Sequence, residues 1–318
     1  MDRAALISRR LKLRHLSVLI EVVEQGSMAK AAKRLATSQP FVSKAIADLE
    51  RTLGLPLLDR GPRGVQPTVY GRALLKRGAA ILDDLRTSVS ELEFLADPTV
   101  GTLRIGSTEA MGASLLPTIV DRLSRRYPRM VFEIVLADSA TLQERDLRGR
   151  RIDVAFGQRS DPTLHGDDLD VTVIYRDRLC VMAGTDNPWS RRRQVTLADL
   201  VDEPWCLPPP AHPVRSLVVD AFRNSGLRQP QNVVTAVSAP FTAGLVAKGQ
   251  LLGVLGSVFH RAYTDRDHLK PLPLKFPAKP WQISAVTLKQ RAPNPVAKLF
   301  LDCAREVAQP LTIPDGHD

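Results

Sequence analysis

The chain has 318 residues, enough for two or three domains that each bury a core of their own. Its apolar fraction of 44% and charged fraction of 25% are those of ordinary globular proteins, and they indicate neither a disordered nor a fibrous chain. No apolar run reaches the roughly 18 residues of a membrane span, and the first residues lack the apolar core of a signal peptide, so we expect a cytoplasmic protein without a membrane partner.

The positive charge is concentrated at the N-terminus. The net charge is +10, and residues 1–77 hold 15 basic against 6 acidic residues, whereas the rest of the chain holds 29 against 28. A basic segment attached to a neutral body indicates that one part binds phosphates and the other part does something else. On charge alone, a basic face that is merely solvated remains the alternative.

Three short helical patterns follow one another between residues 13 and 53. The first has apolar residues at helical spacing and ends at Gly26, because glycine readily adopts the left-handed conformation that closes a helix. Ser27 is suited to cap the second helix, MAKAAKRL, and Ser38 to cap the third, QPFVSKAIADLERTL. Pro40 falls in the first turn of the third helix, where its missing N–H costs nothing.

Two helices joined by so tight a turn, the second of them basic, are typical of a helix-turn-helix whose last helix enters the major groove. The apolar positions of that helix are expected to face the core, and they are Phe41, Val42, Ala45, Ile46 and Leu49. Gln39, Ser43 and Lys44 then fall on the open face near the helix start, where such side chains reach base edges and phosphates. We predict that these three bind DNA, together with Ser27, Ser38 and Pro40; solvated surface residues are the alternative.

A hairpin-like wing is predicted in the segment LPLLDRGPRGVQPT, which turns at residues 61–64. Arg60 and Arg63 at its tip would carry positive charge to the DNA backbone or into a minor groove. A basic loop that contacts nothing is the alternative.

These segments resemble the DNA-binding part of LysR-type transcriptional regulators. The residues that carry the resemblance are the L-x-x-L opening at Leu13–Leu16, EQGS at Glu24–Ser27, AA-x-x-L at Ala31–Leu35, SQPFVSKAI at Ser38–Ile46, LE at Leu49–Glu50, LG at Leu53–Gly54 and R-x-x-RGV-x-x-T at Arg60–Thr68. Met28 and Leu58 depart from the aromatic residues usual in the family but stay apolar. The resemblance implies a winged helix-turn-helix over residues 11–68 that binds double-stranded DNA, with residues 1–10 as a flexible arm.

A helical pattern without proline runs on from Thr68 to about Phe94. Its small and apolar residues alternate steps of three and four, as in a coiled-coil seam, at Leu75, Gly78, Leu82, Leu85, Val89 and Leu92. We predict a linker helix over residues 69–95 that pairs two copies of the chain; a seam packed on its own domain is the alternative. The family resemblance implies the same pairing, a homodimer or homotetramer, and RNA polymerase as a further partner. A hinge is expected at 96–101, ADPTVG.

Strand-like and helix-like segments alternate from residue 102 to the end, which predicts βαβ units on a largely parallel sheet. Strands are expected at 103–105, 130–136, 152–156, 179–182, 205–207, 233–237, 251–254 and 281–288, with helices at 113–127, 141–149 and 295–308. LRIG at Leu103–Gly106, L-x-x-R-x-x-DVAF at Leu147–Phe156 and LVAKGQLLGVL at Leu245–Leu255 resemble the sensor half of LysR-type proteins. The resemblance implies the two-lobed α/β fold of periplasmic binding proteins over 102–318, with lobe one at about 102–157 and 275–318 and lobe two at about 158–274. The predicted fold class is therefore multidomain, an all-α winged helix-turn-helix with a linker helix followed by this sensor domain.

Ligands of such folds collect where strands end and helices begin, because free N–H groups and the helix dipole favour polar oxygens there. The candidate effector-binding residues are Ser107, Thr108, Glu109, Ser139, Leu207, Pro208 and Ser238. Ordinary helix capping is the alternative for each serine. If Glu109 points into the cleft, the effector should be rich in hydroxyl or amino donors; if it points to solvent, an organic acid is expected, and we favour the organic acid.

An enzyme is the rival class, and nothing in the sequence supports one. The six histidines form no metal-binding spacing, and neither a GxSxG motif nor a Walker-type loop is present. Cys180, Cys206 and Cys303 show no CxxC pairing, so we expect no metal, no disulfide and no cofactor. A transport binding protein would not need a helix-turn-helix, and an architectural DNA binder would not need the sensor. A DNA-binding protein with a vestigial sensor lobe stays open beside a regulator that responds to a small molecule and controls transcription.

Overall fold

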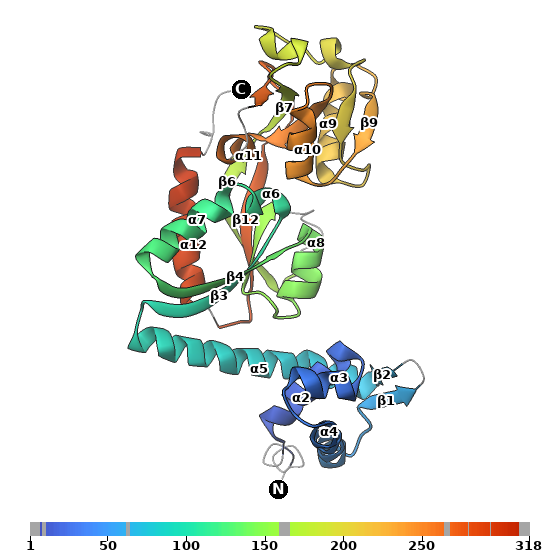
Figure 1. The fold of residues 1–318 in the computed structure, drawn as a ribbon, viewed down its shortest axis with the longest axis vertical. Helices are drawn as coiled ribbons and strands as arrows, with labels where there is room; N and C mark the ends of the chain where they lie inside the picture. The colour runs from blue at the N-terminus through green and yellow to red at the C-terminus, as the bar shows by residue number, and fades with distance from the viewer. Residues whose placement is uncertain are drawn as a thin grey trace. The chain divides into compact units, whose positions relative to one another are not determined.

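The computed structural model describes residues 7, 11–61, 64–158, 166–263, 268–278, 280–292 and 294–311. Its contacts divide the chain into two units, Met1–Leu92 and Glu93–Asp318, and each unit is described by itself (Figure 1).

The N-terminal unit begins with three helices, α2 (Leu13–Gln25), α3 (Met28–Arg34) and α4 (Gln39–Leu53). Gly26 ends α2 with a φ of 62°, the left-handed conformation that the sequence predicts there. The Ser27 hydroxyl accepts from the backbone N–H of Lys30, and the Ser38 hydroxyl accepts from that of Phe41 at 3.4 Å. Both serines therefore act as the predicted N-caps.

The core of this unit is formed by one face of each helix. Val42, Ala45, Ile46 and Leu49 of α4 are buried in it, as predicted. The prediction for Phe41 is wrong, because its side chain is 37% exposed. Phe41 lies at the edge of the buried stripe in the first turn, where the Arg14 guanidinium sits 5.7 Å from its ring centroid.

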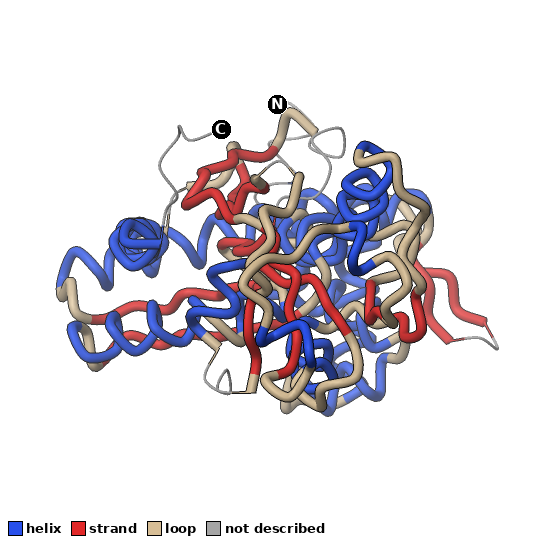
Figure 2. The backbone as a smooth tube through the Cα atoms, turned by 90° about the horizontal axis from the view of Figure 1, so that it is seen from above, coloured by secondary structure: helices blue, strands red, loops and turns tan. Residues whose placement is uncertain are grey.

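Two antiparallel strands, β1 (Leu58–Gly61) and β2 (Gly64–Pro67), form the wing hairpin (Figure 2). The backbone N–H of Val65 donates to the Gly26 carbonyl at 3.0 Å, which ties the wing to the turn between α2 and α3. Gly64 has a φ of 94°, and a Cβ there would lie 2.7 Å from the Gly26 oxygen, so only glycine fits this close approach.

Helix α5 (Val69–Ala96) forms the linker, and its apolar seam has two parts. Leu75 packs on the core of the helix-turn-helix, and Gly78 faces Leu16 of α2. The residues further along the seam are exposed, namely Leu85, Val89 and Leu92. The first part of the seam therefore packs on its own domain, which was the alternative reading of the sequence. The second part is exposed.

The first sheet of the C-terminal unit has the order β4-β3-β5-β12-β6. Its strands are β3 (Val100–Ser107), β4 (Arg129–Leu136), β5 (Val154–Gln158), β6 (Leu169–Asp177) and β12 (Trp281–Leu288). The first three are parallel, whereas β12 runs antiparallel to β5 and β6. Its helices are α6 (Glu109–Gly112), α7 (Leu115–Arg126), α8 (Ser139–Thr141) with a π-helical continuation (Leu142–Leu147), α11 (Ser257–Ala262), α12 (Pro295–Ala308) and a final 3-10 turn (Gln309–Leu311). Helices α7 and α12 lie side by side and contribute to one core with the sheet (Figure 1).

The second sheet has the order β11-β7-β10-β8-β9. Its strands are β7 (Leu179–Gly184), β8 (Trp205–Leu207), β9 (Asn232–Thr235), β10 (Leu252–Gly256) and β11 (Leu269–Pro271). Strand β8 is parallel to β9 and β10, whereas β7 is antiparallel to β10 and β11. Two 3-10 turns (Pro188–Arg191 and Ala198–Leu200) and the helices α9 (Pro213–Asn224) and α10 (Ala239–Val246) complete this lobe. Its core is centred on Trp205 and Phe222, whose rings meet edge-on at 5.8 Å.

The chain crosses between the lobes later than expected. Lobe two was expected from about residue 158, but β6 pairs with β12 along its whole length and belongs to the first sheet. The first crossing therefore lies between Asp177 and β7. A second lies between β10 and α11, but the chain returns to the second sheet for β11 and crosses for the last time between β11 and β12. Periodicity does not reveal pairing between segments so far apart in the sequence. The place of β6 in the first sheet was therefore not predicted.

Candidate functional site

The open face at the start of α4 is the first candidate site. Gln39, Pro40 and Lys44 are exposed there, as a DNA-reading face requires. Ser43 is half-buried, and its hydroxyl donates to the Met28 sulfur at 3.3 Å. Ser43 therefore holds α3 against α4 in addition to any contact that it makes outside the unit.

The other predicted DNA-binding residues surround this face. The hydroxyls of Ser27 and Ser38 are engaged in capping, so their positions at two helix starts are fixed by the fold. Arg60 is exposed on β1 of the wing. Arg63 lies outside the described residues.

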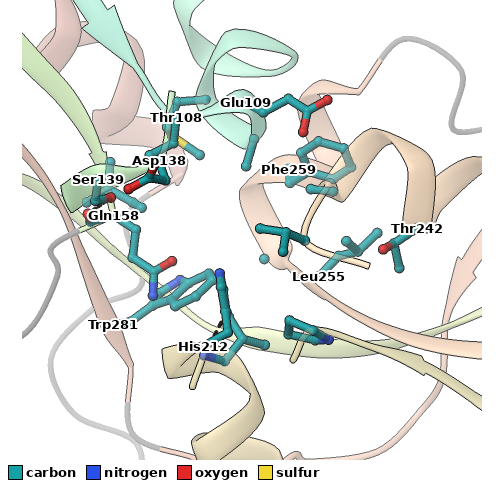
Figure 3. A pocket seen from close by; sticks show the side chains of 18 of the residues that line it. Thr108, Glu109, Asp138, Ser139, Gln158, His212, Thr242, Leu255, Phe259 and Trp281 are labelled. Atoms are coloured by element: carbon teal, nitrogen blue, oxygen red, sulfur yellow. Dashed lines mark hydrogen bonds between the residues drawn. The ribbon is translucent and has the colours of Figure 1, made fainter. Parts of the chain in front are cut away.

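The second candidate site is a cavity of about 440 Å³ between the two lobes of the C-terminal unit. This volume is within the range of pockets that bind small molecules. The polar side chains that line it are Thr108, Glu109, Asp138, Ser139, Gln158, Asp177, His212 and Thr242. Figure 3 shows Thr108, Asp138 and Ser139 on one side, with Leu255, Phe259 and Thr242 facing them.

Four of the seven predicted effector-binding residues line this cavity, namely Thr108, Glu109, Ser139 and Pro208. Ser107 is fully buried and its hydroxyl donates to the Thr108 carbonyl, because the pleat of β3 turns it away from the strand end. Leu207 is fully buried in the core of lobe two.

Ser238 is not one of the lining residues, but it joins the two lobes beside the cavity. Its hydroxyl caps α10 by accepting from the Phe241 N–H at 3.1 Å, and it donates to Glu109 Oε1 at 2.9 Å. Glu109 belongs to lobe one and Ser238 to lobe two, so this hydrogen bond depends on the spacing of the lobes.

Several lining residues were missed by sequence reasoning. Gln158 ends β5, and the rule that ligands collect at strand ends would have found it had the strand been placed to its last residue. His212 caps α9, with Nδ1 accepting from the Val214 N–H at 3.3 Å, and the motif His-Pro before a helix was its available signal. Trp281 and Asp177 come together only through the pairing of β12 with β6.

Asp177 holds the two crossing segments together. Its Oδ1 accepts from the Arg178 N–H, from the Ser257 hydroxyl at 2.7 Å and from the Val258 N–H at 3.2 Å. Its Oδ2 and Nε1 of Trp281 are both buried, and the indole N–H of Trp281 is among the donors that lower the pKa of Asp177. A Cβ at Gly256 would lie 2.3 Å from Oδ2, so glycine is required at this crossing.

The charged residues that line the cavity differ in their ionisation. Hydrogen bonds from the Thr141 hydroxyl and N–H hold the pKa of Asp138 below its ordinary value, so this carboxylate is ionised near neutral pH. Burial raises the pKa of Asp177, and its hydrogen bonds with Ser257, Val258 and Arg178 oppose that rise only in part. Burial lowers the pKa of His212, which favours the neutral imidazole.

The charge of this lining bears on the organic acid that we favoured as the ligand. Glu109 lines the cavity together with Asp138 and Asp177, whereas no Lys or Arg of the described chain does so. Glu109 meets both conditions set from the sequence, because it lines the cavity and is also exposed to solvent, so its position does not by itself choose between the two ligand classes.

Among the described residues, no group of three or more His, Cys, Asp or Glu could hold a metal ion. The same part of the chain contains no helix both long and apolar enough to cross a membrane.

A winged helix-turn-helix with an open reading face, together with a two-lobed α/β unit around a cavity, defines a DNA-binding regulator with a ligand-binding domain. Family models agree: residues 13–72 match the bacterial regulatory helix-turn-helix protein of the lysR family, and residues 96–309 match the LysR substrate binding domain. The chain belongs to the LysR family. It is a LysR-type transcriptional regulator and not an enzyme.

Individual relatives span nearly the whole chain. The transcriptional regulator GbpR of Azospirillum brasilense is 30% identical over 94% of this chain and 87% of its own length. BenM of Acinetobacter baylyi is 31% identical over 82% of this chain and 88% of its own. Among solved structures, full-length OxyR C199D from Pseudomonas aeruginosa shares the fold with a TM-score of 0.70 at 21% identity, covering 96% of this chain and 99% of its own. CbnR in complex with its target DNA does so with a TM-score of 0.65 at 22% identity, covering 94% of this chain and 100% of its own.

Proposed function

We propose that this regulator binds operator DNA through the start of α4 and adjusts that binding when a small molecule occupies the interlobe cavity. The observation that carries the proposal is that both lobes line one cavity, so a ligand in it contacts both of them. A ligand shifts a conformational equilibrium only through contacts that differ between the states, and contacts to two lobes meet that condition.

On α4 we assign base reading to Gln39 and phosphate or base contact to Lys44, because both are exposed near the helix start. The Ser43 hydroxyl donates to Met28, so we assign Ser43 a smaller contribution to DNA binding than Gln39 and Lys44. Ser27, Ser38 and Pro40 set the positions of the two helix starts, and the wing adds positive charge through Arg60 and Arg63.

The test is equilibrium binding of the full-length protein to the intergenic DNA beside its own gene, with random duplex of equal length as reference. Gln39→Ala should weaken specific binding by about 1–3 kcal/mol and leave binding to random duplex nearly unchanged. Lys44→Ala should weaken binding to both duplexes. It should also lower, by about 1, the slope of the logarithm of the binding constant against the logarithm of the salt concentration. Arg51→Ala is the matched control, because Arg51 is exposed at the other end of α4. Equal losses on both duplexes with Gln39→Ala would contradict base reading.

We further propose that the exposed part of the α5 seam pairs two chains, as a homodimer or as a unit of a homotetramer. Two paired copies match the two-fold symmetry of operators with repeated half-sites. Such a protein acts in the cytoplasm, where DNA and RNA polymerase are its partners.

A further inference from the structure

The charge of the interlobe cavity narrows the chemistry of its ligand. Three carboxylates line it, Glu109, Asp138 and Asp177, and the described lining residues include no lysine or arginine. His212 does not supply a positive charge, because its Nδ1 accepts from the Val214 N–H and burial lowers its pKa. A ligand that enters the cavity therefore meets negative charge without compensation from these residues.

Two of these carboxylates remain able to bind a donor. The Asp138 carboxylate is kept ionised by Thr141, since those hydrogen bonds lower its pKa, and each of its oxygens has a second lone pair. Glu109 uses Oε1 to accept from Ser238, which leaves Oε2 for a ligand.

The third carboxylate is buried within the fold, and burial raises its pKa, so it contributes less negative charge than the other two. Asp177 is 1% exposed, its Oδ1 accepts three hydrogen bonds, and the Trp281 indole N–H is a further donor that lowers its pKa. A buried carboxylate is costly unless a nearby positive charge or donor offsets it.

Much of the remaining wall of the cavity is apolar, although Thr108, Ser139, Gln158, His212 and Thr242 also line it. Its apolar part includes Met111, Leu136, Val214, Leu255, Phe259 and Ile283. A polyol would place hydroxyls against this wall and lose their hydrogen bonds to water, whereas an aliphatic or aromatic body would be accommodated.

We infer that the effector is a small organic cation, a protonated amine with an apolar body, whose ammonium group binds the carboxylate of Asp138, while Glu109 adds negative charge at the same cavity. The inference rests on the proposed function, because it names the ligand class of the same cavity. Ammonium-to-carboxylate hydrogen bonds are charge-assisted and stronger than neutral ones, so the amine gains more from this cavity than an alcohol of the same shape. A carboxylic acid of that shape is repelled.

The test uses the full-length protein and matched compounds that differ in one group. Tryptamine, tryptophol and indole-3-acetate share one ring system and carry a positive, neutral or negative end; phenethylamine, phenethyl alcohol and phenylacetate form a second set, and glucose represents polyols. Thermal stability is measured with each compound, and calorimetry gives the affinity of those that stabilise. The amine of each set should stabilise most and the acid least.

Variants distinguish binding of the amine in the cavity from non-specific attraction to acidic residues elsewhere on the protein. Asp138→Asn and, independently, Glu109→Gln should each weaken amine binding by up to about fivefold, because both carboxylates are exposed and an exposed ion pair contributes little. Asp199→Asn is the matched control, because Asp199 is another carboxylate that accepts from a threonine N–H and hydroxyl, and it does not line the cavity. The control variant should bind the amines as the unchanged protein does.

The outcomes distinguish this inference from the proposed function. Stabilisation by the acids, the alcohols or glucose in preference to the amines overturns the cationic class and leaves a ligand-binding regulator. Amine affinity that is unchanged in both cavity variants also overturns it. Absence of stabilisation by every compound overturns the cationic class represented by these amines, whereas the proposed function is judged by its own DNA-binding assay.

Discussion

A buried ion cluster in lobe one, away from the cavity, allows a direct test of what stabilises the C-terminal unit. The Asp153 carboxylate accepts from the Arg104 backbone N–H at 2.8 Å and from its guanidinium at 2.7 Å, and it also pairs with Arg291. The three side chains are 5%, 14% and 6% exposed. Asp153→Ala therefore leaves two guanidinium groups buried beside each other without their anion.

Removing one partner of a buried ion pair costs about 3–5 kcal/mol, because the remaining charge stays buried. For a unit of this size that corresponds to a fall in Tm of roughly 6–20 °C, at about 2–4 °C per kcal/mol. The matched control is Asp302→Ala, whose partner Arg305 lies with it on the surface, at 52% and 50% exposure. An exposed pair is worth less than about 1 kcal/mol.

Urea unfolding followed by circular dichroism measures both variants. The difference between Asp153→Ala and the unchanged protein should also depend on pH. Burial opposes ionisation of Asp153, but Arg104 and Arg291 outweigh it and hold the folded pKa below the ordinary value of about 3.9. The stabilisation is therefore present at neutral pH and is lost as the pH falls below about 4. Equal losses for Asp153→Ala and Asp302→Ala would refute this reasoning.

The remaining predictions concern the lobe crossing and assembly. The pKa of Asp177 is shifted in the opposite direction to that of Asp153. Burial raises the folded pKa of Asp177, so its contribution to stability is present below the unfolded pKa and declines as the pH rises. Asp177→Asn should therefore gain stability relative to the unchanged protein between pH 4 and pH 8 in the same urea assay, and a relative loss over that range would contradict the raised pKa. In α5, Leu85→Lys combined with Val89→Lys should lower the mass measured by light scattering toward that of one chain, because both residues are exposed on the seam. Val69→Lys is the control, because Val69 is an exposed apolar residue of the same helix on the side away from Leu85, and an unchanged mass in the double variant would exclude pairing through this surface.

What the sequence determined by itself is local. Gly26, Ser27, Ser38 and Pro40 mark helix ends through interactions within one turn of the chain, so the three helices could be predicted from residue types alone. The helix α12 and the strand β12 were predicted over the same residues that they occupy, because their periodic patterns are long.

The tertiary structure decided what depends on contacts between distant segments. Strand β6 joins the first sheet only because β12 returns to pair with it, and the same return places Trp281 beside Asp177 at the lobe crossing. Strand alternation turned Ser107 into the core, whereas the strand end alone had suggested a ligand contact. The charge of the cavity was likewise hidden, since Glu109, Asp138 and Asp177 are separated in the sequence and line one cavity only because β3, β4 and β6 end at the same edge of the first sheet.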